Sequence, residues 1–139
     1  MLLACATLDH SVSEGLALSF LTVVPYATQA LGDSVDIDAF RQMVAKNPKG
    51  FLGRYGLGNK LIPEGGSLEE AVEHLTVATQ LDPTHVASHL GLGRVLVSLG
   101  RKDEAKSILQ AGIDAARSGR SNGGGDLVPE MEAIIRTLG

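Results

Sequence analysis

Apolar residues in the second half of the chain recur with the spacing of an amphipathic helix. In the segment 67–81 they are Leu68, Ala71, Val72, Leu75, Ala78 and Leu81. Steps of three or four residues place them on one face, which predicts a helix with one buried side. Ser67 suits the N-cap of this helix, Pro83 cannot continue it, and Thr84 suits the N-cap of a following helix.

Part of this pattern occurs twice, at a distance of 34 or 35 residues. The matched pairs are Gly66 and Gly100, Glu70 and Glu104, Ala71 and Ala105, Leu75 and Leu109, Leu57 and Leu92, and Gly58 and Gly93. Each copy reads as two helices joined by a glycine-containing turn, over 50–62 and 67–81 in the first copy and over 84–99 and 101–117 in the second. A repeat of this length without a strand pattern predicts an all-α solenoid of antiparallel helix pairs.

The order of small and large residues within each copy resembles a known repeat. The matching positions are Arg54-x2-Leu57-Gly58-x2-Leu61, Ala71-x3-Leu75 and Pro83, and then His89-x2-Leu92-Gly93-x2-Leu96 and Ala105-x3-Leu109. They resemble the signature of the tetratricopeptide repeat, a helix pair of about 34 residues. The resemblance implies repeat units over 50–83 and 84–117, with small residues where paired helices cross. Arg54 and His89 stand in the slot that this family fills with tryptophan.

The segments outside the two units complete the expected architecture. Residues 36–49 read as a lead-in helix, 118–126 as a loop rich in Gly, Ser and Asn that we expect to be flexible, and 127–139 as a capping helix. From residue 36 onward the chain resembles short bacterial tetratricopeptide proteins with this arrangement. Residues 1–35 are apolar and acidic, and two interpretations stay open for them: a degenerate repeat helix or an oligomerisation segment.

Composition and charge narrow the range of functions. The chain has 139 residues with 12 Lys and Arg against 16 Asp and Glu, which fits one modest globular domain. A net charge of −4 tells against a nucleic-acid partner. The apolar stretch from Leu16 to Ala30 is too short to span a bilayer and contains Pro25, so we expect no membrane contact. Because Cys5 is the one cysteine, we expect the chain in the reducing cytoplasm.

Two patterns are similar to chemical motifs, and neither is complete. His85 and His89 have the i, i+4 spacing of zinc ligands, but no nearby Glu, Asp or Cys completes a third ligand by motif. The stretch from Gly53 to Lys60 is similar to a phosphate loop, but it follows no strand and no Ser or Thr comes after its lysine. We therefore expect no metal, no cofactor and no catalytic activity.

The tetratricopeptide resemblance also implies a binding surface. In this family the first helix of each pair lines a concave groove that receives an extended peptide or a partner helix. The residues in the corresponding slots are Leu52, Tyr55, Asn59 and Ile62 in the first unit, and Ala87, Leu90, Arg94 and Val97 in the second. Most of them are apolar. We expect Asn59 and Arg94 to face each other across the groove and to hold a peptide backbone or a carboxylate.

These observations favour a non-catalytic protein–protein interaction module that binds an unidentified protein or peptide in the groove. The alternative is a structural assembly unit that self-associates through residues 1–35 into a homo-oligomer. If that segment instead closes the array as a further repeat, a monomeric binder is expected.

Overall fold

The computed structural model describes residues 36–121 and 123–139. The helices in these ranges are α2 (Ile37–Lys46), α3 (Phe51–Leu61), α4 (Leu68–Leu81), α5 (Val86–Ser98), α6 (Lys102–Arg117), the short 3-10 helix η1 (Gly125–Leu127) and α7 (Val128–Thr137). No residue of the described ranges lies in a strand, so the prediction of an all-α protein is confirmed. The predicted roles of residues 1–35 fall outside these ranges.

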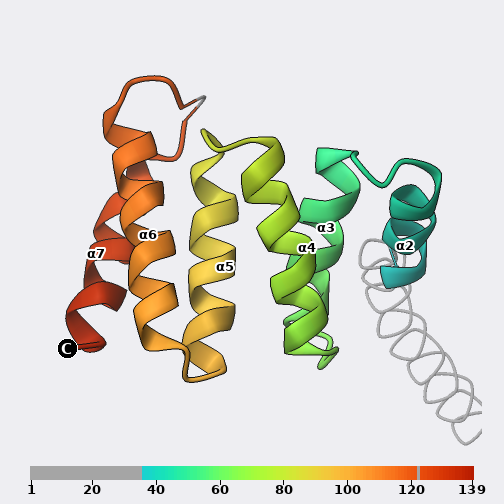
Figure 1. Cartoon of the computed structure of the whole chain (residues 1–139), viewed down its shortest axis with the longest axis horizontal. Coiled ribbons are helices and arrows are strands. Elements are labelled where there is room, and N and C mark those ends of the chain that lie inside the picture. Colours follow the sequence, from blue (N-terminus) through green and yellow to red (C-terminus); the bar gives the residue numbers. More distant parts are fainter. Residues whose placement is uncertain (1–35, 122) are drawn as a thin grey trace, which may run out of the picture. The chain divides into compact units, whose positions relative to one another are not determined.

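The helices stand side by side in chain order, and each runs opposite to its neighbour (Figure 1). The most extensive packing joins α3 to α4 and α5 to α6. Further contacts join α4 to α5 and α6 to α7, so the two pairs and the last helix form a continuous stack. This arrangement confirms the predicted solenoid of antiparallel helix pairs.

The ends of the paired helices lie within two residues of the predicted bounds. Ser67 caps α4 as predicted, since its hydroxyl oxygen accepts a hydrogen bond from the N–H of Glu70 at 3.2 Å. The predicted cap at Thr84 is wrong. Thr84 donates both its hydroxyl and its N–H to the carboxylate of Asp82, at 2.6 and 3.0 Å, and His85 caps α5 instead.

Small residues lie where the helices of a pair cross, as the repeat signature implies. A Cβ added to Gly58 would lie 2.5 Å from Cγ of Leu75, and one added to Gly93 would lie 2.6 Å from Cγ of Leu109. Real Cβ atoms essentially never come closer than 3.0 Å to another atom. The two glycines therefore set the distance between the paired helices, and a side chain at either position would push the helices apart.

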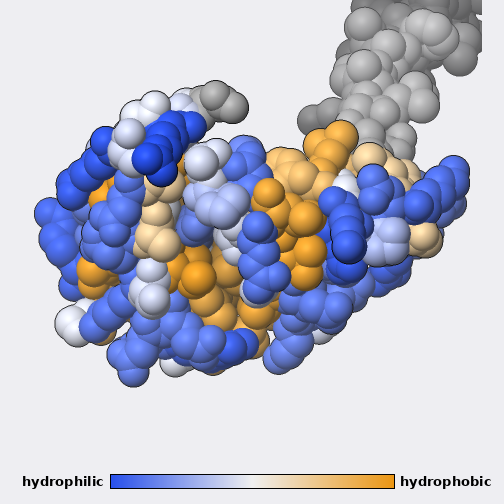
Figure 2. All heavy atoms as spheres, turned by 45° about the horizontal axis from the view of Figure 1, so that its top comes forward, coloured by the Kyte–Doolittle hydropathy of each residue, from blue (hydrophilic) through white to orange (hydrophobic). Residues whose placement is uncertain are grey.

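The buried apolar side chains form two clusters. The first lies around Leu75 and joins α3 and α4 to one side of α5 and α6. The second surrounds Leu109, Ile113 and Met131, where α7 packs onto α6 and the start of α5. On the face that Figure 2 shows, hydrophobic residues gather mainly in the middle of the described part of the chain, and hydrophilic residues surround them. Because Met131 has no exposed surface, α7 covers the apolar end of the second pair.

The loop between α6 and α7 reaches back to the start of α5. Gly123 and Gly124 have φ angles of 113° and 86°, which disfavour any residue with a Cβ. A Cβ on Gly124 would also lie 2.7 Å from Cβ of Val86. The loop thus passes directly over the first residue of α5, and two glycines allow that close approach.

Among the described residues, the lead-in helix α2 packs mainly against α3. None of its residues is buried, and Met43 is 38% exposed. Its main apolar contact is the ring of Phe40 against Gly56, where an added Cβ would lie 2.6 Å from Cδ1 of the ring. A salt bridge from Arg41 to Glu70 at 3.3 Å adds a link to α4.

Candidate partner-binding surface

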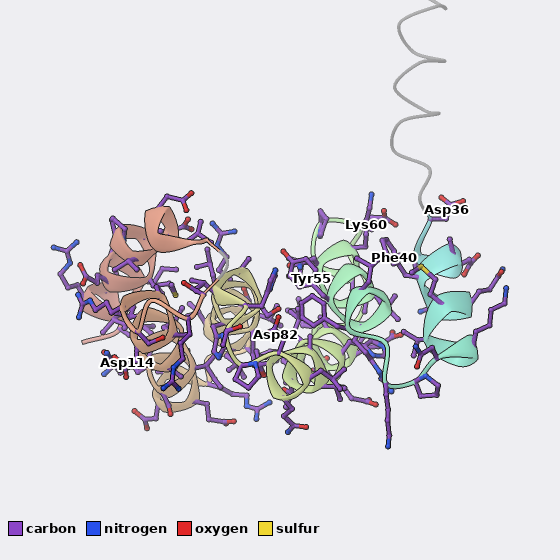
Figure 3. The ribbon with its side chains drawn as sticks, turned by 90° about the horizontal axis from the view of Figure 1, so that it is seen from above. Asp36, Phe40, Tyr55, Lys60, Asp82 and Asp114 are labelled. Carbon is purple, nitrogen blue, oxygen red and sulfur yellow. The ribbon has the colours of Figure 1, made fainter. Side chains whose placement is uncertain are left out.

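The first helices of the two pairs lie on the same side of the stack. Seen from above, α3, α5 and α7 occupy one side and α4 and α6 the other, and α5 is set back between α3 and α7 (Figure 3). The eight predicted groove residues lie on α3 and α5, apart from Ile62, which follows α3 directly. The repeat therefore brings both halves of the predicted surface to one side.

Three rings meet between the first and second repeat, and we call Phe51, Tyr55 and His85 the aromatic corner. The rings of Phe51 and Tyr55, one helical turn apart on α3, are nearly parallel with centroids 5.6 Å apart and 6° between their planes. The ring of His85 stands edge-on to both, at 4.8 and 4.7 Å. Tyr55 points toward the space between α3 and α5 (Figure 3). Such parallel and edge-on arrangements are the favoured geometries of aromatic pairs.

The ring of His85 is held in one orientation because it caps α5. Its Nδ1 accepts the N–H of Ser88 at 3.2 Å and lies 2.8 Å from the Ser88 hydroxyl. Ser88 is completely buried, so water does not compete for its hydrogen bonds to the His85 ring. An Nδ1 that accepts a hydrogen bond carries no proton, and the neutral ring therefore holds its proton on Nε2.

Exposed apolar surface lies next to the aromatic corner. Leu52 is 62% exposed, more than the other large exposed hydrophobic residues of the described chain, Met43 and Leu81. Of the remaining apolar groove residues, Ile62, Ala87 and Val97 are half-buried. Leu90 departs from the expected position at the surface: it is only 5% exposed and packs with Ile113 and Met131. The reason is α7, whose apolar side covers this part of α5.

Asn59 and Arg94, expected to face each other, are each engaged elsewhere. The amide of Asn59 donates from Nδ2 to the carbonyl oxygen of Tyr55 at 3.2 Å. Its Oδ1 approaches Gly91 of α5 so closely that a Cβ there would lie 2.9 Å away. The guanidinium of Arg94 forms a salt bridge with Glu130 of α7. The capping helix thus supplies Arg94 with a carboxylate that the sequence pattern assigned to a partner.

A small cavity of about 140 Å³ adjoins the aromatic corner through His85. Its lining consists of Asp82, Thr84, His85, Val86, Ala87, Gly123 and Gly124. Hydrogen bonds from the Thr84 hydroxyl and N–H lower the pKa of Asp82, so this carboxyl is ionised at neutral pH. The lining of the cavity therefore carries a negative charge at Asp82, and it includes the predicted groove residue Ala87.

The tryptophan slots of both repeats hold polar side chains. In the first, Arg54 donates from Nη1 to Nδ1 of His74 at 2.8 Å and from Nε to the carbonyl oxygen of Pro48 at 3.0 Å. Burial lowers the pKa of His74, and the nearby Arg54 guanidinium lowers it further, against the opposite effect of two neighbouring glutamates. In the second slot burial lowers the pKa of His89, whose Nδ1 lies 3.2 Å from the carbonyl oxygen of His85.

Within residues 36–121 and 123–139 no three His, Cys, Asp or Glu side chains come together in a way that could hold a metal ion. His85 caps α5, and His89 fills the buried tryptophan slot of the second repeat. Of the helices in these ranges, none has the length and apolar character needed to cross a membrane.

The stacked helix pairs and the small residues at their crossings define an α-helical repeat protein of the solenoid class. Residues 64–121 match the family model of the tetratricopeptide repeat. This part of the chain is thus similar to the tetratricopeptide repeat, as the spacing of its small and large residues also indicates. No curated protein gives a significant match to the chain.

Solved structures with the same fold include complexes. The TPR2B domain of yeast Sti1, in a complex with pHsp70, is 18% identical with a TM-score of 0.66, over 82% of this chain and 87% of that chain. PcrH, in complex with the chaperone binding region of PopD, is 16% identical with a TM-score of 0.69, over 88% and 90%. The Sgt2 TPR domain from Aspergillus fumigatus is 24% identical with a TM-score of 0.62, over 82% and 70%. At these identities the similarity establishes the fold.

Sequence reasoning missed two members of the aromatic corner. Phe51 lies one position before the first groove slot, although its i, i+4 spacing to Tyr55 was a signal that both rings share one helix face. In the sequence, His85 stands out only as half of a zinc-like pair with His89. Its contact with α3 depends on how the two repeats stack, and no local pattern encodes that.

Proposed function

We propose that the chain is a non-catalytic protein–protein interaction module whose partner docks on the α3 and α5 side of the stack. The observation that carries this proposal is the aromatic corner together with Leu52, which is 62% exposed beside it. Exposed leucine and half-buried rings on one face are typical of docking surfaces, because a partner removes them from water.

The energetics of this surface favour binding of a partner. Covering the exposed part of Leu52 contributes about 1–2 kcal/mol at the usual value for apolar side chains. The rings are already fixed by their contacts with one another and by the bond from Ser88 to His85, so little conformational entropy is lost when a partner arrives. Half-buried Ala87 and Val97 extend the surface along α5.

Two fold neighbours support this assignment, since their structures contain a bound protein segment: the Sti1 domain with pHsp70, and PcrH with a region of PopD. The described histidines support the non-catalytic part, because each has a structural task. His85 caps α5, while His74 and His89 fill the buried slots of the two repeats. The alternative of self-association depends on residues 1–35, which lie outside the described ranges.

A peptide selection with matched variants tests the proposal. Random peptides selected on the full chain are titrated into isotope-labelled protein, and amide chemical shifts locate the bound surface. Leu52→Glu should abolish binding because it places a charge on the contact surface. Ser107→Glu is the matched control, because Ser107 is also exposed but belongs to α6, which lies on the other side of the stack. If both variants bind equally well, the surface is elsewhere.

A further inference from the structure

We infer that the segment recognised at the aromatic corner is an internal, uncharged apolar stretch of a partner, and that a free C-terminal carboxylate or an acidic side chain is not accepted there. This inference rests on the proposed function and adds the chemistry of the partner to it. It follows from the charges around the corner and from how each is already paired.

Two cations of α3 and α5, Lys60 and Arg94, are already paired with carboxylates of the chain itself. Among the eight predicted groove residues Arg94 is the one charged side chain, and it forms a salt bridge with Glu130. Lys60 follows the groove residue Asn59 on α3, and its Nζ lies 3.7 Å from the Glu64 carboxylate. Lys60 and Tyr55 also lie on different sides of α3 in Figure 3. A carboxylate arriving at the corner would therefore have to compete with an existing ion pair for either cation.

A negative charge lies beside the corner. Asp82 lines the cavity that also includes His85. The Asp82 carboxylate accepts two hydrogen bonds from Thr84 at its Oδ1 and interacts with the neighbouring His85. In the described part of the chain it forms no salt bridge to a Lys or Arg. An acidic group placed on the rings would be repelled by this carboxylate and would lose its own hydration without a replacement partner.

The corner itself offers contacts that suit apolar side chains. The rings of Phe51 and Tyr55 on α3 are nearly parallel, and the ring of His85 stands edge-on to them. The exposed Leu52 follows Phe51 directly on α3. An aliphatic or aromatic side chain gains dispersion and burial on such a surface without needing a charge. Because no ion pair with the partner contributes, affinity should depend little on salt.

The test compares peptides with and without a free C-terminal carboxylate. Random peptides with a free C-terminus are selected on the full chain, and the selected sequence is synthesised as the free acid and as the amide. Fluorescence anisotropy measures both at low and high sodium chloride. We expect the amide to bind at least as tightly as the acid, and the Kd to stay within roughly twofold across the salt range. Aspartate in place of the central apolar residue should weaken binding by roughly tenfold or more.

Two protein variants tie the result to the corner. His85→Asn retains a good N-cap for α5 but removes the ring, so affinity should fall by roughly three- to tenfold while the melting temperature stays close to that of the wild type. Leu52→Ala should weaken binding in the same way, and Ser107→Ala, on α6 at the other side of the stack, is the matched control that should not. Melting curves of all three variants identify any change that comes from unfolding.

The outcomes separate the two levels of the argument. A peptide that needs its free carboxylate, or whose affinity falls steeply with salt, while still depending on Leu52, overturns the inference and leaves the proposed function standing. Selected peptides that bind equally well to wild type, Leu52→Ala and His85→Asn overturn both, because the α3 and α5 surface would then not be the binding site.

Discussion

Replacing Gly93 with alanine should destabilise the protein, because α5 and α6 touch at this glycine. An added Cβ would lie 2.6 Å from Cγ of Leu109, well inside the 3.0 Å that real Cβ atoms respect. Leu109 has no exposed surface, so its side chain cannot turn into solvent to make room. The helices of the second repeat must therefore move apart, which also loosens the cluster that Leu109 shares with Met131 of α7.

The magnitude follows from two opposing effects. Overpacking a filled core costs about 1–3 kcal/mol. Alanine in place of glycine inside a helix favours folding by about 0.5–1 kcal/mol. Overpacking is the larger effect here, since the added Cβ would clash with Cγ as well as Cδ2 of Leu109, and the whole leucine side chain is buried. The expected net loss of about 0.5–2 kcal/mol corresponds to a decrease in Tm of roughly 3–15 °C for a domain of this size.

Thermal melts followed by circular dichroism and urea titrations of the full chain measure this loss. Gly125→Ala is the control, because a Cβ at residue 125 would meet no atom within 4 Å and the residue does not have a positive φ. Gly58→Ala should behave like Gly93→Ala, since its Cβ would lie 2.5 Å from Cγ of Leu75. A Tm for Gly93→Ala that is unchanged or raised would refute the idea that crossing glycines set the distance between paired helices.

Two further predictions concern the cap of α4 and the buried histidines. Ser67→Ala removes the acceptor for the Glu70 N–H and should cost about 1 kcal/mol in thermal denaturation, whereas Ser67→Asn, which keeps a capping oxygen, should cost little. Burial lowers the pKa of both His74 and His89 from 6.5, so below pH 6.5 the folded chain binds fewer protons than the unfolded chain. Stability should therefore be fully present above that pH and fall as the pH decreases through the lowered values. The urea midpoint at mildly acidic and mildly alkaline pH measures this, and equal midpoints would contradict it.

The fold could be predicted from the sequence because its determinants are local and repeated. The 3.6-residue period places apolar side chains of one helix on one face wherever the helix goes, and the 35-residue shift from Gly58 to Gly93 marks equivalent crossings. The cap at Ser67 lies within three residues of its partner. The cap of α5 lies one residue after the predicted Thr84, whose two donors both bond to Asp82.

The sequence by itself thus determined the helices and their pairing. Only the tertiary structure decided what the predicted groove offers to a partner. Arg94 forms a salt bridge with Glu130, which lies 36 residues later in the sequence, and Leu90 is buried with Met131. Both contacts exist because α7 folds back onto the second helix pair. His85 joins the rings of α3 because the two repeats stack at one distance and angle. Contacts of this kind depend on how whole helices dock, and no spacing within a single helix specifies that.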